Sequence, residues 1–365
     1  MFLRKKKTKE YGKLSSDTWK RFRKNPLSII SFIIIVFFIL ISVLGYLITP
    51  DKTPFANEQH LEIAVKKPGF KIEMLHIYDQ NNVKTNFVQT MVFGKKANYK
   101  AIPVYKHWQE KGVLYVETYT GDNPNDGEII SIPHSNYKII TKRYILGTDR
   151  YGRDMLSQLM IGTRVSLSVG LIAVVIAVLI GVTLGSIAGY FGGWADKIIM
   201  WLINVVWSLP TILLVIAITF ALGKGFWQVF VAVGLTMWVD LARMVRGQVM
   251  SLKEKEFVEA GRAMGFTNFR IIFYHILPNV VGAISVITAS NFATAILQEA
   301  GLSFLGIGVQ PPMPSWGTMI KENYGYIILD AAYMAIIPGL AIMLLVFAFM
   351  MLGSGLRQAM NVREK

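Results

Sequence analysis

The pattern of hydrophobic positions opens with a run that contains no charged residue, residues 27–48. At about 1.5 Å per helical residue, a run of this length crosses roughly 30 Å of hydrocarbon. A cleavable signal peptide is the alternative, but the run is longer than a signal core, and the following TPDKTPF offers no small-x-small cleavage site. The run is therefore predicted to be a retained first transmembrane helix.

Further along the chain, stretches with little or no charge recur. They cover residues 165–195, 198–222, 226–239, 280–297 and 331–356. With the first run they predict six transmembrane helices. The stretch 226–239 is short for a span. Its predicted helix therefore ends at Val239 or continues through Asp240 as far as Arg243.

A different pattern fills residues 50–143, between the first two predicted spans. The segments FKIEMLHIY, NFVQTMVF, GVLYVETY and EIISIP alternate in polarity and are separated by turn-forming residues, which predicts short strands. A folded spacer is the favoured interpretation of this β-rich insert, and a docking surface for an extracellular partner is the alternative. The insert's histidines, His60, His76, His107 and His134, show no metal-ligand spacing, and no metal site is predicted.

Composition supports a membrane protein, because 53% of the residues are hydrophobic and only 17% are charged. The absence of cysteine excludes disulfides, a cysteine nucleophile and thiolate metal sites. The net charge of +15 would suggest nucleic acid in a soluble protein. Here the densest basic cluster, RKKK with KRFRK, directly precedes the first predicted span and indicates lipid headgroups instead.

The placement of lysine and arginine predicts the topology, because positive charge near span ends favours the cytoplasm. The basic N-terminus is therefore assigned to the cytoplasm. Six crossings return the C-terminus, with Arg357 and Lys365, to the same side, together with the basic segment 243–275. Residues 49–163 and 301–330 are expected outside.

Between the fourth and fifth predicted spans lies a polar segment that is rich in helix formers. Gly265 is expected to end a short helix in this segment, Asn268 to cap the next one, and Pro278 to mark entry into the fifth span. The short helix is predicted to carry small and apolar side chains on one narrow face: Phe257, Ala260, Gly261, Met264 and Gly265.

The sequence EAGRAMG, followed after nine residues by HILP, resembles the EAA loop of the membrane subunits of ABC importers. The family pattern is Glu-Ala-Ala, three residues, Gly, nine residues, Ile-x-Leu-Pro. This chain departs from it at Gly261, which is still small, and at His275, which is similar to the dipeptide, oligopeptide and nickel branch. DTWKRFRKNPLS, ILGTDRYGRDMLSQLMIGTRVSLSVG and QEAGLSFLGIGVQPPMPSWGTMI also resemble that branch, and the likeness is greatest to the C-type permease of oligopeptide importers.

The resemblance covers residues 17–48 and 144–365 and leaves the insert outside it. It implies an all-α polytopic membrane protein with six transmembrane helices and a permease core 144–365 that contains a coupling loop 243–278. The polarity and charge patterns add a cytoplasmic segment 1–26, a first helix 27–49 and an extracellular β-rich insert 50–143. The implied partners are a second, B-type permease subunit, two cytoplasmic ABC ATPases, an extracellular peptide-binding lipoprotein and membrane lipid, without nucleic acid. The implied location is the plasma membrane of a bacterium.

Residue roles follow from the resemblance and from the local patterns. Coupling to the ATPases is assigned to Glu259, Ala260, Gly261, Met264, Gly265 and Pro278. A candidate outer gate comprises Gly301, Pro311, Pro312 and Trp316, although Trp316 has a headgroup anchor as its alternative. Asn291 and Gln298 are candidate pathway residues, with interhelical hydrogen bonding as the alternative. Oligopeptides are the expected cargo, and nickel or another small solute remains open.

Two small patterns near the second predicted span have structural interpretations. Gly181, Gly185 and Gly189 leave a flat helix face for a close contact, within the bundle or with a partner subunit. Asp149, Arg150, Arg153 and Asp154 mix both signs of charge within a short stretch, and they are close enough to pair if that stretch is helical. Such a stretch is either a solvated, locally paired cap at the membrane surface or a gate-side element that shapes the outer mouth.

Other functional classes fit less well. No Gly-x4-Gly-Lys-Ser/Thr loop occurs, so ATP hydrolysis is assigned to partners, and no hydrolase motif or cofactor site predicts an enzyme. An ion-coupled carrier would place charges at mid-membrane depth. The charged residues Asp196, Asp240, Arg243 and Glu299 are instead placed at span ends. A receptor in which the insert is the functional part and the spans only anchor it is the remaining class. A single span would be enough for such an anchor, whereas six are predicted.

Overall fold

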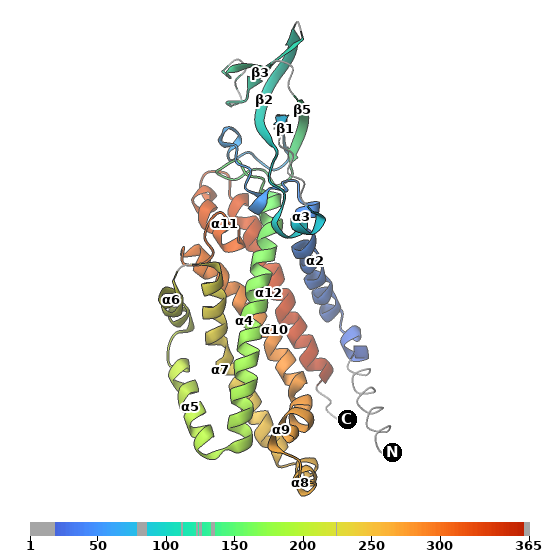
Figure 1. The fold of residues 1–365 in the computed structure, drawn as a ribbon, viewed down its shortest axis with the longest axis vertical. Coiled ribbons are helices and arrows are strands. Elements are labelled where there is room, and N and C mark those ends of the chain that lie inside the picture. The colour runs from blue at the N-terminus through green and yellow to red at the C-terminus, as the bar shows by residue number, and fades with distance from the viewer. Residues whose placement is uncertain are drawn as a thin grey trace. The chain divides into compact units, whose positions relative to one another are not determined.

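The computed structural model describes residues 19–78, 86–110, 112–121, 123, 126–132, 136–223 and 225–360. The chain divides into two compact units. The first, called here the helical unit, comprises residues 1–38, 167–302 and 342–365. The second, called the sheet unit, comprises residues 39–166 and 303–341. Figure 1 labels most of the helices and strands of both.

Long apolar helices dominate the chain (Figure 1). Among the described residues, five helical runs are long and apolar enough to cross a membrane. They are α2 (Pro26–Ile48), α4 (Met155–Phe191), α7 (Phe226–Lys253), the continuous run Asn268–Phe304 and α12 (Tyr333–Met360). A sixth crossing is reached only if the bent pair α5 (Gly193–Trp207) and α6 (Thr211–Leu222) is counted as one span.

The prediction of one regular helix over residues 198–222 is wrong, because α5 and α6 meet at an angle of 95°. Pro210 explains the break, since proline lacks a backbone N–H and disfavours helical geometry in the residue before it. The start of α5 also differs from the prediction. The chain leaves α4 at Phe191 and turns through Gly192 and Gly193, whose φ angles are +65° and +54°. Glycine adopts such angles without steric cost.

Helix α7 extends to Lys253, well beyond the predicted end of the fourth span at Val239 or Arg243. The arginines in this extension do not end the helix, because each has a partner on α5. Arg246 forms a salt bridge with Asp196, and the guanidinium of Arg243 lies 3.8 Å from the centre of the Trp207 ring. Basic residues are thus accommodated on a continuous helix rather than in a loop.

Helices α4 and α7 pack closely along the three glycines of α4. A Cβ added at Gly185 would lie 2.5 Å from the carbonyl oxygen of Ala242, and one added at Gly189 would lie 2.7 Å from that of Arg246. Gly181 faces the backbone of Trp238 in the same way. The predicted flat face is therefore confirmed as a helix contact within this chain.

Within the described residues, the insert forms an antiparallel sheet in the order β4-β3-β2-β1-β5. The strands are β1 (Phe70–Tyr78), β2 (Tyr99–Glu110), β3 (Val113–Thr118), β4 (Ile129–Ile132) and β5 (Tyr137–Tyr144). Met74 and Leu75 of β1 are fully buried on opposite faces, in two hydrophobic clusters. The β-rich character of the insert agrees with the prediction. Of its four histidines, His134 lies outside the described residues.

One predicted strand is wrong, because NFVQTMVF forms the helix α3 (Phe87–Phe93). Its large side chains are mostly exposed, so no buried face requires the alternation of a strand. Arg164 donates hydrogen bonds to the carbonyl oxygens of Met91 and Val92, at 3.1 and 2.8 Å. A cation at the carbonyl end of a helix stabilises it.

Short elements complete the sheet unit. They are the 3-10 turns η1 (Pro54–Ala56), η2 (Leu61–Ile63) and η4 (Tyr324–Ile327), and the helix α11 (Trp316–Asn323). Asp149 and Arg153 do pair, at 2.6 Å, and Arg153 also contacts Glu322 at 2.6 Å. Their segment is a turn ahead of α4 rather than a helix, because two backbone N–H groups also donate to Asp149.

Candidate functional site

The segment that resembles the EAA loop forms a short helix, α8 (Glu256–Ala263), after the C-terminus of α7. Val258 is 1% exposed and belongs to a cluster that also holds Val249 of α7 and Ile271. Gly261 is buried on the same side. Two positions of α8 therefore attach it to the rest of the helical unit, and the opposite side is left open.

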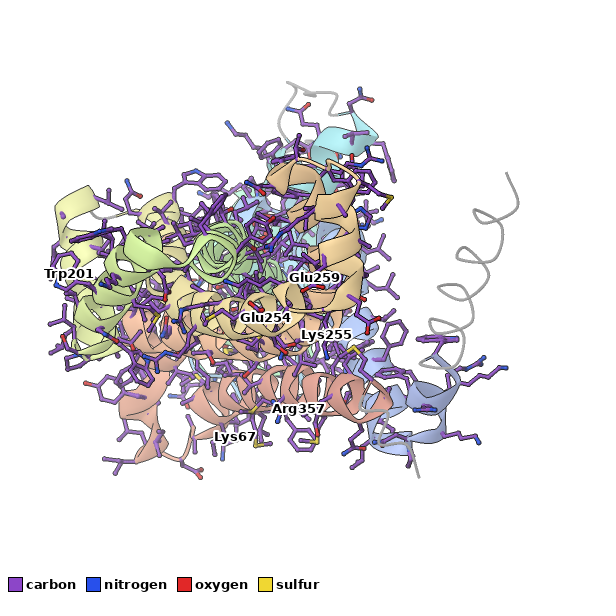
Figure 2. All side chains as sticks on the ribbon, turned by 90° about the horizontal axis from the view of Figure 1, so that it is seen from below. Lys67, Trp201, Glu254, Lys255, Glu259 and Arg357 are labelled. Atoms are coloured by element: carbon purple, nitrogen blue, oxygen red, sulfur yellow. The ribbon has the colours of Figure 1, made fainter. Side chains whose placement is uncertain are left out.

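The open side of α8 is apolar at its centre. Phe257 is 40% exposed and Met264, just after the helix, is 64% exposed, with the exposed Ala260 between them. Glu259 is also exposed, and Figure 2 labels it with Glu254 and Lys255 at this end of the helical unit. The predicted narrow face needs one correction, because Gly261 faces its own chain.

Gly265 ends α8 in a Schellman motif. Its φ angle is +71°, its N–H bonds to the carbonyl of Arg262 at 2.9 Å, and the N–H of Phe266 bonds to that of Gly261 at 3.0 Å. The positive φ confirms the expectation that glycine permits a sharp turn here.

The two departures from the EAA pattern meet at Phe266. A Cβ added at Gly261 would lie 3.5 Å from the Phe266 ring, and His275 stacks on that ring with the centroids 5.5 Å apart. Arg270 covers the ring as well, at 4.0 Å from its centre. Gly261 and His275 thus pack around one aromatic side chain that fixes the chain reversal after α8.

The next helix is capped by Thr267 rather than by Asn268, which corrects the prediction. The Thr267 hydroxyl accepts a hydrogen bond from the backbone N–H of Arg270 at the start of α9 (Asn268–Arg270). The side chain of Asn268 is used differently, because it accepts a hydrogen bond from Tyr190 of α4 at 2.9 Å. Asn268 therefore connects the loop to α4.

Pro278 does not begin a new helix. It lies within a continuous helical run in which α9 leads through the π-helical turn η3 (Ile271–Ile276) into α10 (Leu277–Phe304). The N–H of Leu277 bonds to the carbonyl of Ile272, five residues earlier. Proline has no N–H to donate, and its ring clashes with the carbonyl of the preceding turn in a regular α-helix. The wider π-helical turn before Pro278 relieves this clash.

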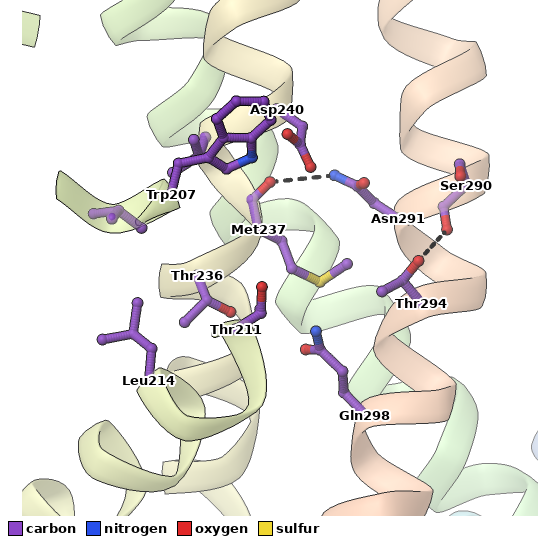
Figure 3. A pocket seen from close by; sticks show the side chains of 12 residues that line it. Trp207, Thr211, Leu214, Thr236, Met237, Asp240, Ser290, Asn291, Thr294 and Gln298 are labelled. Atoms are coloured by element: carbon purple, nitrogen blue, oxygen red, sulfur yellow. Dashed lines mark hydrogen bonds between the residues drawn. The ribbon is translucent and has the colours of Figure 1, made fainter. Parts of the chain in front are cut away.

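A second candidate site is a cavity of about 190 Å³ within the helical unit. Helices α5, α6, α7 and α10 line it, at the level where the α5–α6 pair breaks (Figure 3). The residues drawn there include Trp207, Thr211, Leu214, Thr236, Met237, Asp240, Ser290, Asn291, Thr294 and Gln298.

Both predicted pathway residues line this cavity. Asn291 is largely buried and donates a hydrogen bond to the carbonyl of Met237 at 3.4 Å (Figure 3). The buried side-chain oxygen of Gln298 has no hydrogen-bond partner among the described residues. Asn291 thus makes the interhelical bond that was its alternative interpretation, and it lines the cavity as well.

Sequence reasoning missed Asp240 as a candidate. It was expected at a span end, but α7 continues for more than three turns beyond it, so it lies midway along the helix and lines the cavity. The helical character of the residues up to Lys253 was the available signal, because they contain no helix breaker other than Gly247.

The candidate gate residues lie in different environments. Gly301 belongs to α10, whereas Pro311 and Pro312, joined by a cis peptide bond, lie in the non-helical segment before α11. Trp316 is fully buried, and its indole N–H donates to the carbonyl of Leu159 at 3.0 Å. The headgroup-anchor interpretation of Trp316 is therefore wrong.

Comparison with known proteins identifies the class. Residues 181–362 match the family model "Binding-protein-dependent transport system inner membrane component", and residues 13–68 match "N-terminal TM domain of oligopeptide transport permease C". The glutathione transport system permease protein GsiD of Pectobacterium atrosepticum is 44% identical over 220 residues, which cover 60% of this chain and 73% of that protein. The chain belongs to this family of permease subunits of ABC importers, and the resemblance found in the sequence is confirmed.

A second curated protein and a solved structure also match the chain. The dipeptide transport system permease protein DppC of Alkalihalophilus pseudofirmus is 43% identical over 219 residues, covering 60% of this chain and 72% of that protein. Among solved structures, the inward-facing MetNI methionine ABC transporter has a TM-score of 0.46 and 21% identity, covering 56% of this chain and 97% of that one.

Proposed function

We propose that this chain is the C-type permease subunit of an ABC importer for oligopeptides and that it forms half of the translocation pathway. The family membership supports an importer, and the names of the relatives, glutathione and dipeptide permeases, support a peptide cargo. A nickel chelate or another small solute is the alternative within the same branch. The chain has no phosphate-binding loop, so ATP is hydrolysed by partner subunits.

The exposed apolar side of α8 carries the proposal. Phe257, Ala260 and Met264 form a strip one helical turn apart, while Val258 and Gly261 hold the helix to its own chain. An amphipathic helix of this kind docks its apolar side in a groove of a partner. In this proposal the partner is a cytoplasmic ATPase, Glu259 sets the register, and Gly265 and Pro278 shape the connection to α10.

The proposed assembly contains a B-type permease, two ATPases and an extracellular peptide-binding lipoprotein, in the plasma membrane of a bacterium. Both termini face the cytoplasm and the insert faces outward. The proposed organisation is segment 1–26, helix 27–49, insert 50–143 and core 144–365 with the coupling loop 243–278. Gly301, Pro311, Pro312 and Trp316 contribute to the outer gate, with Trp316 acting as a buried support.

The test uses the importer purified from its native membrane through a tag on this chain. Glu259→Arg and the double variant Phe257→Ala/Met264→Ala are compared with Glu128→Arg, a matched change on the exposed part of the insert. The α8 variants are expected to lose ATPase subunits on purification and to lower peptide uptake by about tenfold or more, because buried anchor residues dominate such contacts. Glu128→Arg is expected to retain both.

Two results would overturn the proposal. One is unchanged uptake and ATPase recovery in both α8 variants. The other is recovery of the chain without ATPases, together with solute transport driven by an ion gradient, which would indicate a secondary carrier.

A further inference from the structure

Asp240 is a free carboxylate midway along an apolar helix. It is exposed at the cavity between α5, α6, α7 and α10, and within the described part of the chain it forms no hydrogen bond or salt bridge. Of the described residues that line this cavity, it alone carries a charge. Ionisable side chains inside a membrane are costly, and they usually face a water-filled path or a partner.

The basic residues that follow Asp240 on α7 do not neutralise it. Arg243, one turn further on, covers the Trp207 ring at 3.8 Å, and Arg246 is held by two hydrogen bonds from its guanidinium to Asp196. Each arginine therefore has a partner on α5. The carboxylate of Asp240 is left available to a group that enters the cavity.

The remaining lining complements a peptide. Figure 3 shows Asp240 on α7 facing the side of the cavity that α10 forms, near Asn291. Along α10, Ser290, Thr294 and Gln298 add hydroxyl and amide groups, and the side-chain oxygen of Gln298 has no partner among the described residues. The Ser290 hydroxyl and the Gln298 amide can donate to and accept from the backbone of a peptide. The Thr294 hydroxyl, which donates to the carbonyl of Ser290 at 3.1 Å, can accept, and the carboxylate of Asp240 favours a cation.

We propose that Asp240 binds the positively charged amino terminus of a peptide during its passage, with Gln298 and the hydroxyl groups of α10 contacting the peptide backbone. This inference rests on the proposed function, because it assumes that the cavity belongs to the translocation pathway of a peptide importer. It adds a specificity determinant inside the membrane, selective for a free ammonium group, to any selection by the binding protein.

The first measurement uses the complete importer in proteoliposomes and a labelled tripeptide with a free amino terminus. Asp240→Asn is expected to lower the uptake rate by about tenfold, the usual scale for losing a hydrogen bond to a charged group, while ATP hydrolysis continues. Asp240→Glu is expected to restore most of the uptake. Asp330→Asn, a matched change at an exposed carboxylate of the sheet unit, is expected to leave uptake unchanged.

The second measurement exploits the absence of cysteine in the chain. Thr294→Cys places a thiol in the cavity, and its alkylation by a water-soluble maleimide is followed on this chain by mass spectrometry. Saturating tripeptide, loaded binding protein and ATP are expected to slow the alkylation. In the double variant Asp240→Asn/Thr294→Cys, the peptide is expected to give little protection.

The outcomes separate the two proposals. Equal protection with and without Asp240, or full uptake in Asp240→Asn, overturns the ammonium site and leaves the pathway intact. No protection of the Thr294→Cys thiol in either background overturns the assignment of the cavity to the pathway, and the ammonium site with it. Loss of uptake that Asp240→Glu does not restore indicates a structural role and also overturns the site.

Discussion

The carboxylate of Asp196 accepts hydrogen bonds from Nε and Nη2 of Arg246, at 2.5 and 2.7 Å. This bidentate pair joins the first turn of α5 to α7, and both side chains are at least three-quarters shielded from solvent. An aspartate in the first turn of a helix also interacts favourably with the helix dipole. Asp196 was expected at a span end, with no partner assigned, and the structure pairs it with Arg246.

Breaking this pair is expected to destabilise the helical unit modestly. Arg246→Gln should lower the free energy of unfolding by about 1 kcal/mol, since partial exposure reduces the value of an ion pair. Thermal unfolding of the protein in detergent measures the change. The exchanged pair Asp196→Arg/Arg246→Asp should recover part of the loss, and equal stability of Arg246→Gln and the parent would contradict the assignment.

Gly185 should tolerate no side chain, because an added Cβ would lie 2.5 Å from the carbonyl oxygen of Ala242. Gly185→Ala is expected to cost about 1–3 kcal/mol as α4 and α7 are forced apart. Gly339→Ala is the matched control, since it lies in α12 with no atom within 4 Å of the added Cβ. Folded yield after urea treatment compares the two, and similar yields would argue against close packing.

Gly265→Val should uncouple transport while the protein remains in the membrane. The added Cβ meets no atom within 4 Å, so the cost arises from the φ angle of +71° and falls on the turn alone. A left-handed conformation costs roughly 1–2 kcal/mol in other residues. Peptide transported per ATP hydrolysed is the measurement. Gly247→Val, at an open helical position, is the control, and a Gly265→Val importer with normal uptake would refute the prediction.

The insert should lose stability in acid through Glu58. Burial would raise the pKa of this carboxyl, but His60 and the Lys142 ammonium, 2.7 Å away, lower the pKa to about 2. A depressed pKa stabilises the folded state above the ordinary value of 4.5, and this stability is lost as the pH falls toward 2. The expected loss by about pH 3 is roughly 2 kcal/mol.

Hydrogen-exchange protection of the β5 amides at different pH values measures this loss. Glu58→Gln is the control, and it should remove most of the pH dependence. Burial raises the pKa of Asp154, which acts in the opposite direction, so the difference between the parent and Glu58→Gln isolates the effect of Glu58. A parent with the same pH profile as Glu58→Gln would disprove the role of the pair.

Much of the helical architecture was predictable, because long uncharged runs have few alternatives in a membrane. The runs at 27–48 and 331–356 correspond closely to α2 and α12. The errors arise where tertiary contacts override local pattern. Arg246 remains in a helix because Asp196 pairs with it, and α3 is a helix because Arg164 binds its carbonyl end.

In the candidate sites, too, local pattern predicted some features and tertiary contacts determined the others. The position and ending of α8 followed from spacing, since Gly265 was expected to turn the chain and has the φ angle for it. The orientation of α8 was not readable, because Gly261 faces inward only through its packing near Phe266 and Ile271. Asp240 was missed because its depth depends on how far α7 extends.

The order of strands in the insert has a consequence for association. Among the described residues, the outermost strands are β4, which has four residues, and β5, which carries the exposed Lys138 and Arg143. Short or positively charged outer strands resist the addition of a further strand from another molecule. Addition of a strand from another copy to this sheet is therefore disfavoured, and a protein that binds the insert is expected to contact its side chains rather than to extend the sheet.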